Sequence, residues 1–503
     1  MNIEDIKKMT YEELDVKTAR QLYDICKELR IKNYTSFKKD DLINEIISVA
    51  KGEKVIVRKK RGRKSKAEIE ALKKTDDGEA KKQLLFETQT DYIEDKPKET
   101  LGFTHKPEQM PVSNEEKRSV PEPVFHKDPS QGQGSGVLEI HPDGYGFLRT
   151  SYVPNPKDIY LAPSQIRRFG LRNGDYIEGS VRFPTKVGEK YAAMIKVDTA
   201  NGVDPEAVRN RPHFENLIPI FPNDKLRLEI RGTNDVTVRL IELLSPIGKG
   251  QRGMIVSPPK VGKTTIIKRI ARAISLNHPE VVLMILLVDE RPEEVTDMQR
   301  SVKAQVISST FDQLPENHIR VVELAIERAK RLVEMKKDVV ILMDGITRLT
   351  RAYNLVMSPT GRTLTGGLDT SAIHGPKKFL GAARNIDNGG SLTILATCLI
   401  ETGSKMDEVI YEEFKGTGNM ELVLDRKLAE RGLYPAIDTK RSGTRRDELL
   451  YSEEERKRVW SLRRFLSNLE SYEALEKLIK WVSETPNNDT FLRNIVPDEE
   501  RKR

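Results

Sequence analysis

The stretch Gly253–Thr265, which reads GMIVSPPKVGKTT, constrains the fold of this chain the most. It begins with a short apolar run, long enough for one buried strand, and Pro258 and Pro259 prevent that strand from continuing. The residues that follow are amphipathic at helical spacing. A strand, a tight loop and a helix that opens with Gly-Lys-Thr are the arrangement of a phosphate-binding P-loop. In such a loop Lys263 reaches the terminal phosphates and Thr264 ligates Mg²⁺.

One position departs from the usual P-loop pattern. Ser257 stands where the first glycine of G-x-x-x-x-G-K-[ST] is expected. A Gly-Lys-Thr triplet on its own is weak, because such triplets also occur by chance in loops. The strand before it and the helix after it favour a nucleotide site over an ordinary loop.

Two further apolar runs end in carboxylates. The run Val281–Val288 leads into Asp289 and Glu290, and a later run ends at Asp344. Buried parallel strands deliver such residues to the nucleotide edge of a sheet. Asp344 has the Walker B pattern for holding Mg²⁺, and Glu290 is the candidate for polarising the attacking water, whereas Asp289 and Arg291 could instead pair structurally. One such run alone is usually an ordinary loop, but this order after a P-loop predicts an NTPase.

The composition limits the classes of protein that fit. The chain of 503 residues has room for about two to four domains. A net charge of +8 favours a polyanionic partner. Cys26 and Cys398 are too few for a disulfide framework, and the chain has neither a run of about 18 apolar residues nor a signal peptide at its start. We therefore expect a cytoplasmic protein with no membrane partner.

Residues 136–212 are predicted to form a small all-β domain of short strands separated by Gly, Pro and Asn turns. Within it, Gly144–Arg149 reads GYGFLR and places Tyr145 and Phe147 on one face of a strand. Alternating aromatic residues usually belong to a core. Two aromatics separated by glycine and followed by Arg149 instead favour the exposed stacking surface of an OB-fold or cold-shock domain, where RNA bases bind.

The other segments differ in composition. Residues 1–50 have the apolar spacing of a small helical bundle. Residues 51–135 contain the basic run Lys54–Lys66 and are poor in aromatics, which predicts a disordered insertion that is either merely solvated or an additional electrostatic contact to nucleic acid. Residues 213–440 alternate strand-like and helical runs, so we expect a largely parallel sheet with helices on both faces, and residues 441–503 are helical by pattern.

No obvious arginine finger lies near the P-loop in the sequence. The arginines of Arg441–Arg446, which reads RSGTRR, are far along the chain in a polar segment. They could simply solvate a helix end. If one of them instead acts in trans, each site lies between two subunits, and a ring is implied.

These residues together resemble the bacterial transcription termination factor Rho family of hexameric RecA-type RNA helicases. The resemblance covers residues 1–50 and 136–503. It rests on the P-loop with its Pro-Pro-Lys and on Ser245–Gly253 (SPIGKGQRG), Asp289–Val295 (DERPEEV), Gly403–Glu408 (GSKMDE), Gly416–Asn419 (GTGN) and Arg441–Arg445 (RSGTR). It implies an α/β fold with a RecA-like P-loop NTPase core, an N-terminal helical bundle and an OB-fold/cold-shock-like β-barrel. Family members often carry Ala at the position of Ser257, so the missing glycine is no objection.

The resemblance implies ATP and Mg²⁺ as cofactors. The implied catalytic residues are Lys263, Glu290, Asp344 and the trans arginine finger Arg445, and the implied metal ligands are Thr264 and Asp344. Tyr434 would stack on the adenine. The implied nucleotide-binding set is Gly248, Lys249, Gly250, Gln251, Arg252, Gly253, Lys260, Val261, Gly262, Lys263, Thr264, Thr265, Arg291 and Tyr434.

The family also implies two RNA sites. The primary site, which prefers pyrimidines and especially cytosine, would comprise Gly144, Tyr145, Gly146, Phe147, Leu148, Arg149, Asp158, Ile159, Tyr160, Glu189, Lys190 and Tyr191. The central channel would comprise the Q-loop, Arg362, Thr363, Leu364, Thr365, Gly366 and Gly367, and the R-loop, Glu401–Lys405, with Lys405. The implied partners are single-stranded RNA, five further copies of the chain in a homohexamer, RNA polymerase and elongation factors.

Two positions depart from the family. Gly432 stands where a second arginine commonly lies beside the subunit interface, and the insertion at 51–135 is absent from shorter members. We expect the insertion to add RNA affinity without sequence preference. The alternatives to an RNA translocase are a rotary-type ATPase subunit, which shares the RecA-like core, and a non-catalytic RNA-binding ring. The aromatics Tyr145 and Phe147 disfavour the rotary subunit, and the presence of Glu290 and Arg445 disfavours the non-catalytic ring.

Overall fold

A computed structural model describes residues 131–185 and 189–497, together with seven residues nearer the N-terminus: Leu14, Gln21, Leu22, Ile25, Cys26, Ile43 and Ile46. Those seven belong to a first compact unit, Met1–Lys117, and the two long ranges belong to a second unit, Arg118–Arg503. The bundle predicted for residues 1–50 and most of the predicted insertion at 51–135 therefore lie outside the described residues.

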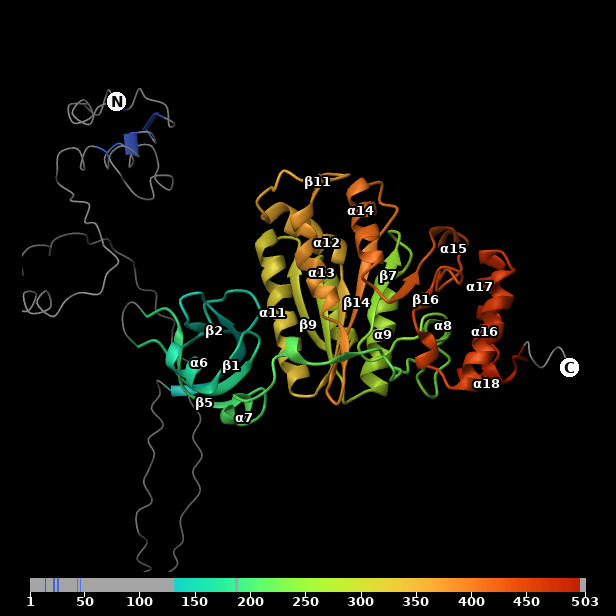
Figure 1. Ribbon diagram of the computed structural model, residues 1–503, viewed down its shortest axis with the longest axis horizontal. Coiled ribbons are helices and arrows are strands. Elements are labelled where there is room, and N and C mark those ends of the chain that lie inside the picture. Colours follow the sequence, from blue (N-terminus) through green and yellow to red (C-terminus); the bar gives the residue numbers. More distant parts are fainter. Residues whose placement is uncertain are drawn as a thin grey trace, which may run out of the picture. The chain divides into compact units, whose positions relative to one another are not determined.

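The first part of the second unit is a closed five-stranded barrel with the strand order β1-β2-β3-β5-β4. Strands β3 and β5 pair in parallel and the other pairs are antiparallel. Alternate residues point inward, so that Leu138, Leu148, Leu161 and Ile177 form one apolar core. This confirms the predicted β-barrel, whose elements are β1 (Gln131–Ile140), β2 (Gly146–Arg149), β3 (Ile159–Leu161), α6 (Pro163–Phe169), β4 (Tyr176–Arg182) and β5 (Ala192–Ala200) (Figure 1).

The barrel begins earlier than the sequence indicated. Residues 131–135, predicted to end the disordered insertion, form the first half of β1 and pair with β4. Their sequence, Gln-Gly-Gln-Gly-Ser, has no alternation of apolar and polar residues, so a strand could not be predicted there. The glycines are required by close packing: a Cβ on Gly134 would lie 2.6 Å from Ile159, and one on Gly136 would lie 2.9 Å from the backbone of Leu148.

The second part is an α/β domain built on a nine-stranded sheet with the order β16-β15-β7-β14-β10-β8-β9, to which β13 and β6 are added at β14. Its six central strands pair in parallel, as predicted. These strands are β7 (Arg252–Ser257), β8 (Val282–Glu290), β9 (Gln305–Thr310), β10 (Asp338–Asp344), β14 (Ser391–Leu399) and β15 (Met420–Val423). The antiparallel additions are β6 (Pro219–Ile220), β13 (Arg384–Ile386) and β16 (Gly443–Thr444).

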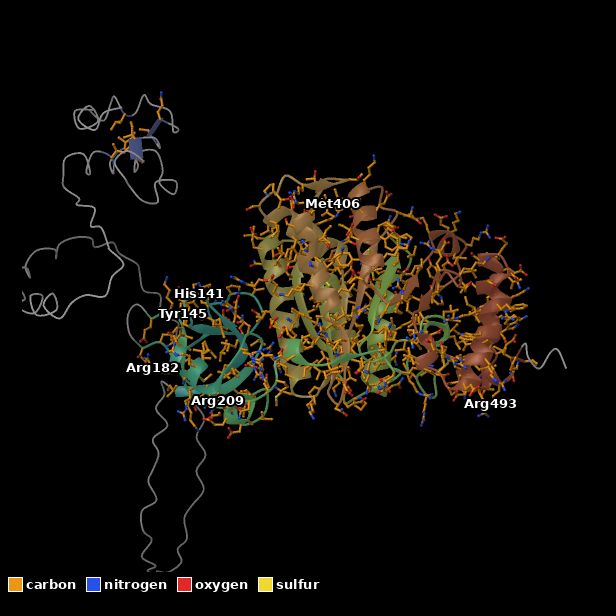
Figure 2. The ribbon with its side chains drawn as sticks, in the orientation of Figure 1. His141, Tyr145, Arg182, Arg209, Met406 and Arg493 are labelled. Atoms are coloured by element: carbon orange, nitrogen blue, oxygen red, sulfur yellow. The ribbon has the colours of Figure 1, made fainter. Side chains whose placement is uncertain are left out.

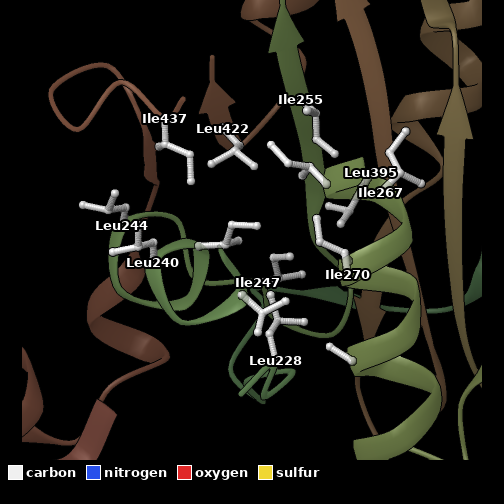
Figure 3. Packing of buried hydrophobic residues seen from close by; sticks show 14 of the residues in the cluster. Leu228, Leu240, Leu244, Ile247, Ile255, Ile267, Ile270, Leu395, Leu422 and Ile437 are labelled. Carbon is white, nitrogen blue, oxygen red and sulfur yellow. The ribbon is translucent and has the colours of Figure 1, made fainter. Parts of the chain in front are cut away.

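Apolar cores lie on both faces of the sheet because the central strands are apolar on both sides. Ile255 of β7 belongs to one core, and its neighbours Met254 and Val256 belong to the other. Figure 3 shows the first core, where Ile255, Leu395 and Leu422 face Leu240, Ile267 and Ile270. Its helices are α8 (Val236–Leu244), α9 (Lys263–Asn277), α10 (Pro292–Ser301), α16 (Glu453–Ser467), α17 (Ser471–Ser483) and α18 (Asn488–Arg493).

The second core contains helices α11 (Pro315–Glu334), α12 (Ile346–Val356), α13 (His374–Gly381) and α14 (Lys405–Lys415), and it also takes in Val137 and Tyr152 of the barrel. The C-terminal helices α16–α18, whose helical structure was predicted, belong to the first core and pack on the sheet domain. No helix in the part of the chain that the structure describes is long and apolar enough to cross a membrane. The shorter elements are α7 (Pro205–Val208), η2 (Phe214–Asn216), β11 (Thr363–Leu364), β12 (Leu368–Asp369), η3 (Thr370–Ile373), α15 (Arg426–Glu430) and η4 (Asp447–Leu449).

A buried ion network joins the barrel to the sheet domain. Glu334, at the end of α11 and fully buried, accepts hydrogen bonds from Arg172 at 3.0 Å, Arg211 at 2.9 Å and the backbone N–H of Phe214 at 2.9 Å. Arg211 also donates to Asp175 of the barrel at 2.7 Å. Because buried charges are costly unless they are paired and hydrogen-bonded, this network fixes how the barrel sits on α11.

Candidate nucleotide and RNA sites

The phosphate loop, Pro258–Gly262, connects β7 to α9 as the sequence predicts. Lys260 and Gly262 have positive φ angles, 66° and 91°. Ser257, where a glycine was expected, is the last residue of β7, and its Oγ donates to the carbonyl of Pro258 at 2.8 Å. An extended strand residue needs no left-handed conformation, and this explains why serine serves at that position.

Lys263, Asp344 and Thr264 meet at the carboxyl end of the sheet. Lys263 Nζ lies 2.5 Å from Asp344 Oδ1, which also accepts from the hydroxyl of Thr397 at 2.8 Å. Asp344 Oδ2 is buried and has no hydrogen-bond partner among the described residues. Thr264 Oγ1 lies 3.5 Å from a carboxylate oxygen of Glu294. An unsatisfied buried carboxylate oxygen suits Mg²⁺, which prefers oxygen ligands. Asp344, together with the hydroxyl of Thr264 next to Lys263, could therefore hold it.

Glu290 is buried at the end of β8. Asp289, with a φ of 56°, forms a bulge that shifts the register with β9 between Val288 and Glu290. Such a bulge re-aims the following side chain. Arg348 Nη1 of α12 lies 3.0 Å from Glu290 and 3.7 Å from Asp289. Burial, and next the charge of Asp344, raise the pKa of Glu290 to about 7.

Arg348 is the residue of this site that sequence reasoning missed. It lies in the first turn of α12, which follows β10 directly. Asp289 therefore pairs with Arg348, and not with Arg291 as the alternative held, and it shares Arg348 with Glu290. The available signal was an arginine four residues after the Walker B aspartate, which places it in the first turn of the helix at the same sheet edge.

Tyr434 comes to the phosphate loop from a distant part of the chain. Its side chain is 57% exposed, and a Cβ on Gly262 would lie 4.0 Å from its ring. An exposed ring above the start of α9 is suited to stack on a flat base. Arg291 directly follows β8 and caps α10 at the same edge of the sheet.

Six of the predicted nucleotide-binding residues lie elsewhere in the subunit. Residues 248–252 precede β7 or begin it, whereas the phosphate loop follows its other end. A six-residue strand spans about 20 Å. Lys249 pairs with Asp224 at 2.8 Å and with Asp338, the first residue of β10, at 3.0 Å. These ion pairs hold the segment at the edge of the sheet where the parallel strands begin. Gly253 lies inside β7. In their own chain, Gly248, Lys249, Gly250, Gln251, Arg252 and Gly253 therefore lie away from the phosphate loop, and their binding to a nucleotide stays a prediction.

Arg445 is also far from the phosphate loop of its own chain. It follows β16, which pairs with Met420 at the start of β15, and its backbone N–H donates to Asn419 at 2.8 Å. Met420 pairs in turn with Gly253, near the start of β7. Arg445 therefore lies at the amino edge, whereas Lys263 lies beyond the carboxyl edge. A role in its own site is excluded, and a role in trans stays a prediction.

Gly432, the departure from the family pattern, has a local reason. It follows α15 with a φ of 75°, and its N–H donates to the carbonyl of Ala429 at 2.9 Å. This is the left-handed end of a helix, where glycine is favoured and arginine is strained.

The barrel displays its predicted aromatic residues on the outside. Leu148 points into the core, and Phe147 and Arg149 on either side of it point outward. The ring of Phe147 lies 5.8 Å from Tyr145, 6.1 Å from Tyr160 and 4.9 Å from Tyr191, each edge-on or nearly so. Half-buried rings at β2 and β3 and the exposed ring of Tyr191, just before β5, therefore form one cluster on the outside of the barrel, as a base-stacking surface requires.

Charged residues hold this cluster in place. The guanidinium of Arg149 lies over Phe147 at 5.0 Å and is fixed by Glu139 at 2.6 Å and by the buried Asp158 at 2.5 Å. Glu189 is paired with Arg182 at 3.0 Å. Sequence reasoning missed Glu139, and it also missed His141, whose ring stacks on Tyr145.

The two predicted channel loops lie side by side. Arg362–Gly367 forms most of the small β11–β12 hairpin, and the R-loop ends at Lys405, the first residue of α14. A Cβ on Gly366 would lie 2.7 Å from the backbone of Met406, so the hairpin touches the start of α14, and Figure 1 shows both at one end of the sheet domain. Arg362 and Lys405 are exposed.

Comparison with known families divides the chain in the same way. Residues 13–53 match the Rho termination factor N-terminal domain, and residues 134–206 match the Rho termination factor RNA-binding domain. Residues 237–444 match the nucleotide-binding domain of the ATP synthase alpha/beta family. The match over residues 134–206 coincides with the barrel, and the match over residues 237–444 coincides with the parallel sheet.

Curated relatives match more than two thirds of the chain. The transcription termination factor Rho of Pseudomonas aeruginosa is 59% identical over 363 residues, which cover 71% of this chain and 86% of that protein. The Rho of Escherichia coli K12 is 58% identical with the same coverage. The Rho of Borreliella burgdorferi is 57% identical over 72% of this chain and 70% of its own.

Proposed function

The chain belongs to the transcription termination factor Rho family, and on that premise we propose that it acts as a hexameric ring that pulls single-stranded RNA through its centre. The chain is an RNA-dependent ATPase of the termination machinery. One observation supports assembly into a ring. The nucleotide site of a subunit has its lysine and carboxylates in place, while Arg445 of the same subunit lies at the opposite edge of the sheet.

Within one subunit, the residues around Asp344 prepare ATP hydrolysis. Lys263 and the backbone N–H groups at the start of α9 bind the phosphates. Asp344 and Thr264 hold Mg²⁺, which neutralises charge on the phosphates when it is bound. Glu290 takes a proton from the attacking water, and Arg348 orients the Glu290 carboxylate through the contact at 3.0 Å.

A neighbouring subunit completes the site. Arg445 of that neighbour stabilises the charge that develops in the transition state, as an arginine finger does. Tyr434 stacks on the adenine beside Gly262. Hydrolysis therefore requires assembly, and a monomer hydrolyses ATP slowly.

RNA binds at two places. The ring cluster around Phe147 captures pyrimidine-rich RNA, with cytosine preferred. The exposed Arg362 and Lys405 grip the RNA backbone in the channel. In the cytoplasm, the moving ring acts on RNA polymerase and its elongation factors.

The two alternative functions lack comparable support. A rotary-type ATPase subunit shares the core, but the match to the ATP synthase family is limited to residues 237–444. The Rho relatives, in contrast, are 57–59% identical over 71–72% of the chain. A non-catalytic ring would not need Lys263, Asp344 and Glu290 assembled at one sheet edge.

The deciding experiment measures ATP hydrolysis by the purified protein with and without poly(C). We expect poly(C) to stimulate hydrolysis, Lys263→Ala to abolish it, and Tyr145→Ala to require more poly(C) for the same rate. Hydrolysis that is independent of RNA, or no hydrolysis at all, would contradict the proposal.

A further inference from the structure

The inference concerns His141, which none of the family features covers. His141 follows β1 directly and begins the turn to β2. Its backbone N–H donates to the carbonyl of Tyr145 at 2.8 Å, and its own carbonyl accepts from Gly144 at 2.8 Å. These bonds fix the backbone of the turn, so the side chain of His141 projects from a rigid hairpin beside Tyr145 (Figure 2).

The imidazole of His141 covers one face of Tyr145. The two ring centroids are 4.7 Å apart and the planes differ by 12°. The other ring pairs in this cluster are tilted or edge-on, with interplanar angles of 33° to 88°. His141 and Tyr145 thus form the parallel stack of the described cluster, which is the geometry that a nucleic-acid base adopts on an aromatic ring.

The outer end of this stack is open to solvent. Phe147 and Tyr160 lie 5.8 Å and 5.9 Å from Tyr145, while the side chain of His141 is 49% exposed. A base can reach Tyr145 on the side of His141 only by displacing the imidazole. At that end of the ring cluster the outermost ring is therefore that of His141, and Tyr145 lies between His141 and the rings of Phe147 and Tyr160.

We propose that His141 is a further base-binding residue of the primary RNA site and stacks on one additional base beyond those held by Tyr145 and Phe147. Histidine rings serve as stacking surfaces in RNA-binding proteins. Asp143 faces the imidazole, with its carboxylate 3.2 Å from Nδ1, and this contact limits rotation of the ring. Nε2 is the remaining polar atom of the ring, and it can bind the edge or the phosphate of that nucleotide.

The inference rests on the proposed RNA-binding function, and a single set of variants tests both. The probe is an oligocytidine RNA with a fluorescent cytosine analogue at one position at a time, whose emission falls when the base stacks. We expect His141→Ala and His141→Leu to weaken binding about tenfold, since stacking on one aromatic ring contributes about 1–3 kcal/mol. Quenching should disappear at one terminal position only, and His141→Phe should restore both affinity and quenching.

The control is His278→Ala, which changes a histidine at the far end of α9 from the phosphate loop and should leave RNA binding unchanged. Unchanged or stronger binding by His141→Ala would overturn the inference, because the imidazole would then be only packing for Tyr145 or a cover that RNA displaces. If Tyr145→Ala also left RNA binding unchanged, the proposed RNA site itself would fail. The two failures are therefore distinguishable.

Discussion

The RNA site and the nucleotide site differ in how one chain builds them. The RNA site is a set of outward-facing rings from neighbouring strands of a small barrel, and its charged supports, Glu139 and Asp158, are in the same barrel. The nucleotide site is a set of buried charges from the ends of β8 and β10 and the start of α9. Its proposed arginine, Arg445, lies at the far edge of the sheet.

The difference follows from what each ligand needs. Stacking of bases needs flat exposed surfaces, which one strand and its neighbours supply. Phosphoryl transfer needs positive charge on several sides of the phosphates. One sheet edge supplies only one of those sides. We therefore expect RNA affinity to be a property of each subunit, and ATP turnover to be a property of the assembly.

The largest expected effect is that of Arg445→Ala. ATP turnover should fall about 10³-fold or more, because an arginine finger contributes about 10³–10⁵ in kcat. Binding of ATP and of RNA should remain measurable, since Arg445 acts on charge in the transition state. Steady-state hydrolysis and binding of a fluorescent nucleotide give the two quantities.

Mixing two inactive variants tests whether Arg445 acts on the site of a neighbouring subunit. Subunits with Arg445→Ala combined with subunits with Lys263→Ala should regain part of the activity, because some interfaces then contain an intact lysine and an intact arginine. No gain at any ratio would place the function of Arg445 inside its own chain, contrary to the structure.

The second effect concerns the junction that joins the two regions. Glu334→Gln should lower the free energy of unfolding by about 3–5 kcal/mol, because it removes the buried charge that Arg172 and Arg211 share. The matched control is Glu316→Gln, an exposed residue of the same helix. Calorimetry should show the barrel and the sheet domain separating into two transitions in Glu334→Gln. A single unshifted transition would mean that the network does not hold the regions together.

The smallest effect is the dependence of hydrolysis on pH. Glu290 must be ionised to accept a proton from water, and its pKa is raised to about 7. The value of kcat/KM for ATP should therefore rise with pH through a midpoint at about 7 and level off above it, because this quantity reports the free enzyme. The charge of Arg348 lowers the pKa of Glu290, so Arg348→Met should move the midpoint to higher pH. A midpoint near the ordinary value for glutamate would contradict the assignment.

Local patterns were sufficient for several parts of the fold. The run GMIVSPPKVGKTT predicted β7, the phosphate loop and α9, because proline and glycine limit the backbone there. Strict alternation around Leu148 predicted an outward Phe147 and Arg149. The start of β1 was missed because Gln131–Ser135 lacks apolar residues, and its strand depends on pairing with β4, which is more than forty residues away.

What the sequence determined by itself was the chemistry: a lysine in a phosphate loop, carboxylates at strand ends and aromatic residues on an exposed strand. Only the tertiary structure decided which of these groups meet. It placed Arg348 on Glu290 and His141 on Tyr145, and it moved residues 248–252 away from the phosphate loop. The reason is that a spacing along one element fixes which face a residue occupies, whereas contacts between elements depend on the order and direction in which the strands pair.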